Sequence, residues 1–97
     1  MPKKLPPIHP GEYLKEEFMA DFGLSANQLA KALLIPSNRI SAIINGTRGI
    51  TADTALRLSR YFGNTPQFWM NMQARYDLEV ASAESGKAVS QIKPHAA

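Results

Sequence analysis

"LSANQLAKALLIPSNRISAIING" (residues 24–46) contains two short helix patterns joined by a three-residue connection. In the first pattern, Ser25 is a favourable N-cap and Gln28 follows three residues later, which is the spacing of a capping box. Because proline forces the residue before it toward extended geometry, Pro36 predicts that this helix stops ahead of it. The apolar face of the helix is predicted to consist of Leu29, Ala30 and Leu33.

The second pattern begins near Ser37. Its isoleucines recur at the i, i+3, i+4 spacing of one helix face: Ile40, Ile43 and Ile44. Asn45 and Gly46 then tolerate the left-handed backbone that ends many helices. Since only residues 34–36 connect the two helices, we expect a sharp turn between them.

The opposite face of the second helix carries hydrogen-bonding side chains: Ser37, Asn38, Arg39 and Ser41. Two helices joined by a tight turn, with polar residues at the start of the second, are typical of a helix-turn-helix, whose second helix lies in the DNA major groove. There Asn38 would pair with adenine and Arg39 with guanine. Ser37 and Asn45 also suit plain helix caps, whereas Arg39 has no evident local partner.

Residues beside this row are predicted to contact the phosphate backbone. Asn45, Thr47 and Arg48 follow the second helix directly, and contacts of this kind position a protein on DNA without specifying a sequence. Ser25 and Gln28 lie at the start of the first helix, whose N-terminal amides attract anions. With the polar row, these residues form the predicted DNA-binding set.

Three further helix patterns flank the pair and predict an all-α fold. They cover residues 10–22, 51–62 and 65–81, and Gly23 and Gly63 stop the first two. No strand pattern longer than a few residues interrupts them, so we expect five helices in one domain over residues 9–81. Residues 1–8, rich in Pro and Lys, predict a flexible arm, and residues 82–97 a flexible tail.

The last helix pattern contains an apolar stripe with two interpretations. It consists of Phe68, Trp69, Met72 and Tyr76. These side chains either close the core of the monomer or form part of a dimer contact, because a five-helix domain of this size has a limited interior.

Composition excludes several classes of site. The chain of 97 residues has no cysteines, which excludes a disulfide framework and a cysteine-based zinc site and fits a cytoplasmic protein. The two histidines, His9 and His95, lie far apart in the sequence, so we expect no metal site, no cofactor and no enzymatic activity. His9 is predicted to be a structural residue ahead of the first helix. The chain has no run of about 18 apolar residues, so we expect no membrane span. We also expect no secretory signal, because no apolar stretch follows the two lysines near the first residue.

The net charge of +3 is unevenly distributed. Residues 25–60 hold five Lys or Arg side chains against a single carboxylate, so the basic excess coincides with the helix-turn-helix pattern. Such an excess attracts polyanions, although an ordinary solvated surface would give the same count.

Three longer motifs carry a family resemblance. They are "HPGEYLKEEF" (residues 9–18), "NGTRGITADTALRL" (residues 45–58) and "FWMNMQARYDL" (residues 68–78). In this combination they resemble the HigA-type antitoxins, helix-turn-helix proteins of the XRE (Cro/C1, phage-repressor-like) family.

The resemblance implies a phage-repressor-like domain that forms a homodimer through its C-terminal helix region. It further implies binding to a palindromic operator in the chain's own promoter and neutralisation of a HigB-like toxin that cleaves mRNA. By position, Ser37, Asn38, Arg39 and Ser41 fall on the recognition helix, and Thr47 and Arg48 on the loop that meets the DNA backbone.

The chain departs from the family pattern at two positions. Leu34 occupies the turn position where glycine is common, which predicts a slightly reshaped turn, and Ala26 replaces a frequent glutamine. Two alternatives remain: a stand-alone repressor without a toxin, or a protein-interaction module that has lost DNA binding.

Overall fold

The computed structural model describes residues 6–95, which are helices joined by short turns and loops without a strand. The helical segments are α1 (Pro10–Tyr13), η1 (Leu14–Met19), α2 (Ala20–Phe22), α3 (Ala26–Leu33), α4 (Ser37–Ile44), α5 (Ala52–Phe62) and α6 (Pro66–Val89). Because α1, η1 and α2 follow one another without a break, the described part of the chain contains five helices. The all-α, five-helix prediction is therefore confirmed. Most of the predicted arm, residues 1–5, lies outside the described residues.

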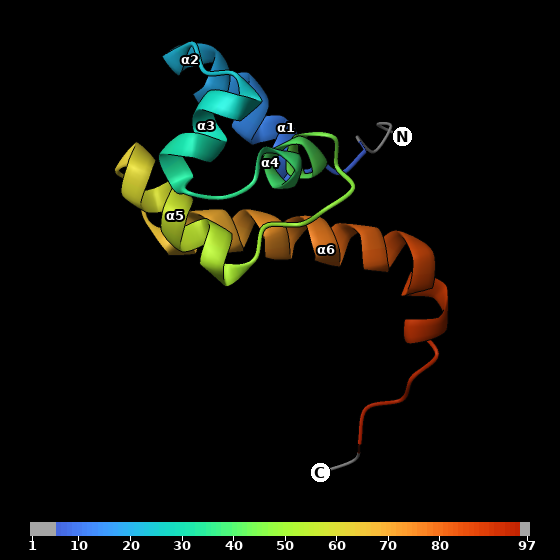
Figure 1. Cartoon of the computed structure of the whole chain (residues 1–97). Coiled ribbons are helices and arrows are strands. Elements are labelled where there is room, and N and C mark those ends of the chain that lie inside the picture. The colour runs from blue at the N-terminus through green and yellow to red at the C-terminus, as the bar shows by residue number, and fades with distance from the viewer. Residues whose placement is uncertain (1–5, 96–97) are drawn as a thin grey trace.

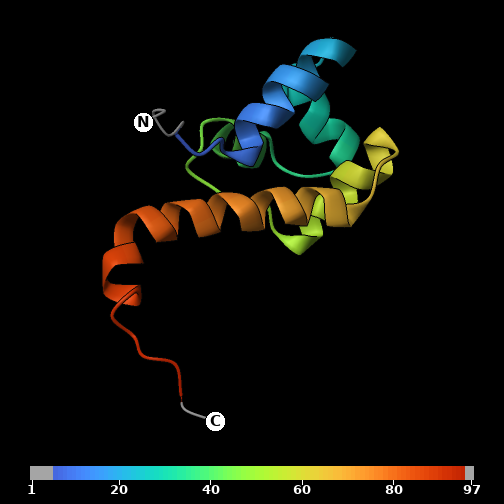
Figure 2. The same cartoon turned by 180° about the vertical axis from the view of Figure 1, so that it is seen from behind.

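The helices pack around the α3–α4 pair (Figure 1). The α1 end of the first helix contacts both α4 and α6, while α5 lies against α3 and α6. The C-terminal part of α6 extends beyond the rest of the bundle, as Figure 2 shows from behind. The described chain thus consists of a packed bundle and one projecting helix end.

The first helix departs from regular α-geometry in its middle. Residues 14–19 form a π-turn, in which the Ala20 N–H donates to the carbonyl of Lys15. Leu14 and Met19, five residues apart, are both buried, whereas Phe18 is only half-buried. The wider turn therefore brings two residues five apart in the sequence onto the buried side of this helix.

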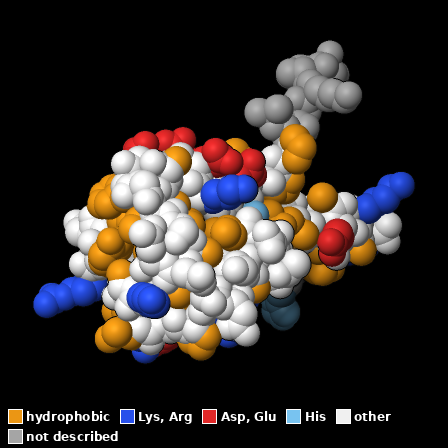
Figure 3. Space-filling model, turned by 45° about the horizontal axis from the view of Figure 1, so that its top comes forward, with side chains coloured by type: hydrophobic (Ala, Val, Ile, Leu, Met, Phe, Trp, Pro, Cys, Tyr) orange, Lys and Arg blue, Asp and Glu red, His pale blue; other side chains and the backbone are white. Residues whose placement is uncertain are grey.

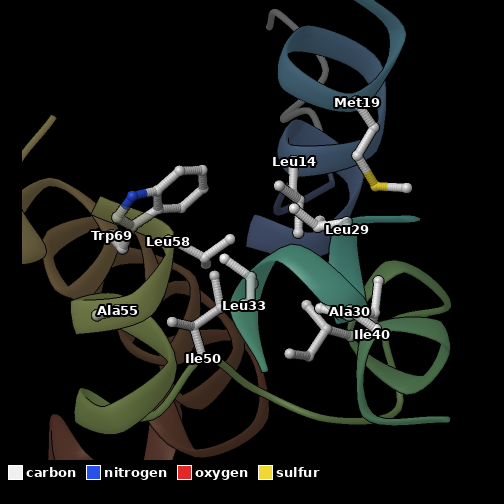
Figure 4. Close-up of a cluster of buried hydrophobic side chains, with 11 residues drawn as sticks. Leu14, Met19, Leu29, Ala30, Leu33, Ile40, Ile50, Ala55, Leu58 and Trp69 are labelled. Atoms are coloured by element: carbon white, nitrogen blue, oxygen red, sulfur yellow. The ribbon is translucent and has the colours of Figure 1, made fainter. Parts of the chain in front are cut away.

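The core joins side chains from every helix (Figure 4). Leu29, Ala30 and Leu33 of α3 are buried as predicted, together with Ile40 and Ile43 of α4, whereas Ile44 is half-buried. The ring of Trp69 is 0% exposed, and its Nε1–H donates to Oδ1 of Asn64 at 2.9 Å. Its indole nitrogen is therefore satisfied inside the monomer.

Most predicted helix ends are confirmed, but Ser37 does not cap α4, because Pro36 is the N-cap and no side-chain cap hydrogen bond is present. Ser25, Thr51 and Thr65 each cap a helix with a side-chain oxygen, and Gly23 and Gly63 adopt the left-handed conformation that stops one.

The final helix is longer than predicted. It continues to Val89, eight residues beyond the expected end at 81. Apolar periodicity stops near residue 81, but Ala, Glu and Lys in the following residues have high helix propensity and no proline interrupts them. The helix end expected at residue 81 was therefore placed too early, while the flexibility of residues 82–97 stays a prediction.

Gly11 allows the first helix to touch the end of α4. A Cβ atom at this position would lie 1.7 Å from the carbonyl oxygen of Ile43. We expect Gly11→Ala to lower the free energy of unfolding by about 1–3 kcal/mol, because the two backbones must separate. Urea unfolding followed by circular dichroism, at fixed protein concentration, measures this change.

Gly86→Ala is the matched control, because no atom outside α6 lies within 4 Å of its added methyl group. This change in the last turn of α6 should instead leave stability unchanged or raise it by less than about 0.5 kcal/mol. Equal effects at the two glycines would contradict the close approach of α1 to α4.

His9 holds the start of the same helix. Its Nδ1 accepts a hydrogen bond from the Gly11 N–H at 2.9 Å, and its ring lies edge-on to Tyr76 with centroids 4.8 Å apart. Burial lowers the pKa of His9 below its ordinary value of about 6.5, and the nearby charge of Asp77 opposes this shift. A neutral imidazole is required, since protonated Nδ1 cannot accept.

The lowered pKa predicts a pH-dependent stability. The folded state binds fewer protons at His9 than the unfolded state, so this contribution is complete above about pH 6.5 and is lost as the pH falls below it. In His9→Asn the amide retains a capping oxygen without titrating. We expect its unfolding free energy to fall less than that of the wild type between about pH 7.5 and about pH 5.5. Identical pH profiles in urea titrations would contradict this role of His9.

Candidate nucleic-acid interface

Helix α4 presents two chemically different faces. Ile40 and Ile43 are buried against the rest of the bundle, while Ser37 and Asn38 are exposed at its start. Arg39 and Ser41 are half-buried. Because the apolar face anchors the helix, the polar row is held toward solvent as a set.

The turn before α4 keeps a left-handed residue although it is not glycine. Leu34 has φ 61° and ψ 42°, and its side chain is 83% exposed. The Ile35 N–H donates to the carbonyl of Ala30 at 3.0 Å, which closes the end of α3. The prediction of a reshaped turn is therefore wrong, because Leu34 adopts the left-handed conformation at a cost on the order of 1 kcal/mol.

Arg57 of α5 stabilises this turn from outside the motif. Its Nη1 donates to the carbonyls of Leu33 at 2.9 Å and Leu34 at 3.3 Å. Its Nε donates to Oδ2 of Asp53 at 2.9 Å. These bonds satisfy carbonyls that the end of α3 leaves without helical partners.

Asp53 also lies beside the recognition helix. Its Oδ2 is 3.5 Å from Nη1 of Arg39, so Arg39, which has no evident local partner in the sequence, has a partner on α5. Ion pairs this exposed contribute little stability, and the remaining guanidinium donors stay available. The support of this turn by Asp53 and Arg57 was not predicted, although their i, i+4 spacing on a predicted helix is typical of an ion pair.

The loop after α4 folds back onto the helix. The carbonyl of Ala42 accepts from the Thr47 N–H, the Thr47 hydroxyl and the Arg48 N–H at 3.0, 3.1 and 3.2 Å. Gly46 supplies the left-handed residue with φ +80°, whereas Asn45 remains right-handed. The Thr47 hydroxyl proton is therefore used within the loop, while the exposed Arg48 carries its positive charge.

Ser25 and Gln28 lie on a different helix from the polar row. Ser25 Oγ accepts from the Gln28 N–H at 3.2 Å, and Gln28 Oε1 accepts from the Ser25 N–H at 2.9 Å. The capping box is thus confirmed. Both residues are exposed, and the amide group of Gln28 keeps Nε2–H donors that the cap does not use.

The stripe of the last helix is divided by burial. Trp69 belongs to the monomer core, which removes it from the candidate dimer surface. Phe68, Met72 and Tyr76 instead line a groove of about 410 Å³. The N-terminal segment and α1 contribute Pro6, Ile8 and Tyr13 to this groove, and the ion pair of Arg75 and Glu79 on α6 also lines it.

Charge does not mark a single basic patch on the face in Figure 3. Acidic side chains gather along one edge of that face, and the Lys and Arg side chains stand apart from one another. On this face the cations are therefore dispersed, and no dense basic cluster is visible there.

Two other kinds of site are absent from residues 6–95. No helix there has the length and apolar character needed to cross a membrane. No group of three or more His, Asp or Glu side chains in that range is arranged to hold a metal ion.

Comparisons with known proteins agree with this geometry. The family model described as helix-turn-helix matches residues 14–69. Virulence-associated protein I of Dichelobacter nodosus is 56% identical over 81 residues, covering 84% of this chain and 75% of that protein.

Two solved structures are similar over almost the whole chain. An addiction module antidote protein of a HigA family from Coxiella burnetii has a TM-score of 0.88 and 54% identity, covering 94% of this chain and 100% of that one. Pseudomonas aeruginosa antitoxin HigA, solved with the higBA promoter, has a TM-score of 0.89 and 45% identity, covering 93% and 99%. The chain therefore belongs to the HigA family of helix-turn-helix proteins.

Proposed function

We propose that this chain is a DNA-binding antitoxin that represses its own operon in the cytoplasm. The polar row on α4 carries the proposal, because a buried apolar face holds four hydrogen-bonding side chains outward on one short helix. Its similarity to an antitoxin solved with promoter DNA supports the same function. The activity is one of binding, without a catalytic step.

In this proposal α4 enters the major groove. Asn38 and Arg39 contact base edges, while Ser37 and Ser41 contact either bases or phosphates. Arg48 meets the phosphate backbone from the following loop. The remaining backbone contacts come from Ser25, Gln28, Asn45 and Thr47, and Thr47 reaches a phosphate after the loop rearranges, because its hydroxyl proton is otherwise donated to Ala42.

The DNA-bound form is proposed to be a homodimer. A two-fold dimer places two copies of α4 about 34–36 Å apart, which matches a palindromic operator with half-sites one turn apart. The groove lined by Phe68, Met72 and Tyr76 is the proposed apolar contact between the two copies.

The proposed protein partner is a HigB-like toxin that cleaves mRNA. Coexpression with the product of a neighbouring small gene tests this partnership through growth rescue and copurification. Operator binding without either effect would instead favour a stand-alone repressor.

Arg48→Ala is expected to weaken binding to all duplexes similarly and to lower the salt dependence, d log K/d log[salt], by about one unit. Arg39→Ala should cost about 1–3 kcal/mol of binding free energy and relax the preference at one base pair per half-site. Fluorescence anisotropy with a duplex from upstream of the gene, and with a scrambled duplex, measures both effects at two salt concentrations.

Lys87→Ala is the control, because it removes the same charge from the last turn of α6, far along the chain from α4. It should leave the sequence preference unchanged. Unchanged affinity and preference in Arg39→Ala would show that the recognition helix is misplaced, and absence of any preference in the wild type would exclude operator binding.

Met72→Glu is expected to convert the dimer into monomers, since it places a charge in the proposed apolar contact. Sedimentation velocity measures the oligomeric state, and circular dichroism checks that the helices remain. Leu56→Glu places the same charge on α5 at a residue that is 59% exposed, and should stay dimeric. A monomeric wild type, or a dimeric Met72→Glu variant, would contradict this interface.

A further inference from the structure

Gln73 is a buried polar residue of α6 that the proposed DNA contacts do not use. Its side chain is 9% exposed. Its Oε1 accepts a hydrogen bond from the Ile50 N–H at 2.7 Å, and its Nε2 donates to Oδ1 of Asp77 at 2.9 Å. One amide therefore connects the loop after the recognition helix to the last helix of the bundle.

The loop passes directly over this amide. A Cβ atom added to Gly49 would lie 3.1 Å from the Cδ, Nε2 and Oε1 atoms of Gln73. Ile50 itself is 3% exposed, so its N–H has little access to water as an alternative partner. Loss of the Gln73 acceptor would leave a buried backbone donor unsatisfied, which is costly.

Gln73 supplies the second anchor of the loop that carries Arg48. The carbonyl of Ala42 holds the beginning of the loop through Thr47 and Arg48, and Gln73 holds its end at Ile50. Arg48 forms part of the first anchor through its own N–H and lies two residues ahead of the second anchor at Ile50. Its position relative to α4 therefore depends on both of them.

The identity of residue 73 follows from its two partners. Ile50 requires an acceptor and the carboxylate of Asp77 requires a donor, and a glutamine amide provides both. Asp77 fixes which end of the amide faces the loop. The side chain of His9 also faces Asp77, and His9 and Asp77 line the same cavity beside Arg48.

We propose that Gln73, oriented by Asp77, is a positioning residue that sets the geometry of the DNA-contacting loop and so links operator affinity to α6. This inference rests on the proposed function. It adds to that function a residue of α6 that is buried beneath the loop and lies outside the predicted DNA-binding set.

Exchange of donor and acceptor between residues 73 and 77 tests the proposal. In Gln73→Glu the new carboxylate repels that of Asp77 and is displaced from the Ile50 N–H, so affinity for the upstream duplex should fall about tenfold. Asp77→Asn alone should change affinity by less than about twofold, since its amide oxygen still accepts. In the double variant the new amide at position 77 donates to the new carboxylate at position 73, and affinity should return to within about threefold of the wild type.

Net charge alone predicts a different pattern. If only charge mattered, Asp77→Asn would strengthen binding by the same factor by which Gln73→Glu weakens it. The two changes in binding free energy would then add in the double variant. Gln73→Met separates the explanations further, because it removes both hydrogen bonds without changing charge. We expect it to weaken binding about tenfold and to lower the salt slope as Arg48→Ala does.

Amide hydrogen exchange at Ile50 provides a readout that is independent of DNA. Exchange should accelerate in Gln73→Glu and Gln73→Met and slow again in the double variant, while circular dichroism shows unchanged helix content. Additive affinities, or protection of Ile50 that is unchanged in Gln73→Met, would overturn the positioning role. A wild type that does not bind the duplex would instead overturn the proposed function, and Ile50 exchange would still decide whether Gln73 holds the loop.

Discussion

Burial of Ile40 and Ile43 holds helix α4 in place, and the contacts that the surrounding elements make with α4 depend on this position. A helix of eight residues is too short to be stable in water by itself, so α4 persists because its apolar face is removed from solvent. The same burial decides which side chains face outward. Ser37 and Asn38 are presented as a rigid pair because the residues beside them are held in the core.

Support for α4 comes from parts of the chain that are distant in sequence. Gly11 allows α1 to contact the end of α4, and Arg57 of α5 satisfies carbonyls at the end of α3. The loop after α4 is held by Ala42 on one side and by Gln73 of α6 on the other. The helix-turn-helix is therefore held from three directions, by contacts from α1, α5 and α6.

Features that depend on contacts between residues close together in the sequence could be predicted from it. Features that depend on contacts between distant residues could not. The capping box of Ser25 and Gln28 was predicted because its atoms lie within four residues. The end of α6 was placed too early because the prediction followed apolar periodicity, and a helix end that projects into solvent needs only propensity. The sequence showed no local partner for Arg39, because its partner Asp53 lies on another helix.

The amino-acid sequence alone was enough to specify the five helices, the turn between α3 and α4 and the polar row that faces away from the isoleucines. Caps, stops and periodicity are local properties, and local energies favour them in any surroundings. Packing between helices was needed to place Trp69 in the core while Phe68, Met72 and Tyr76 line a groove. One helical stripe contains all four residues, and which of them become buried depends on the helices that pack against it.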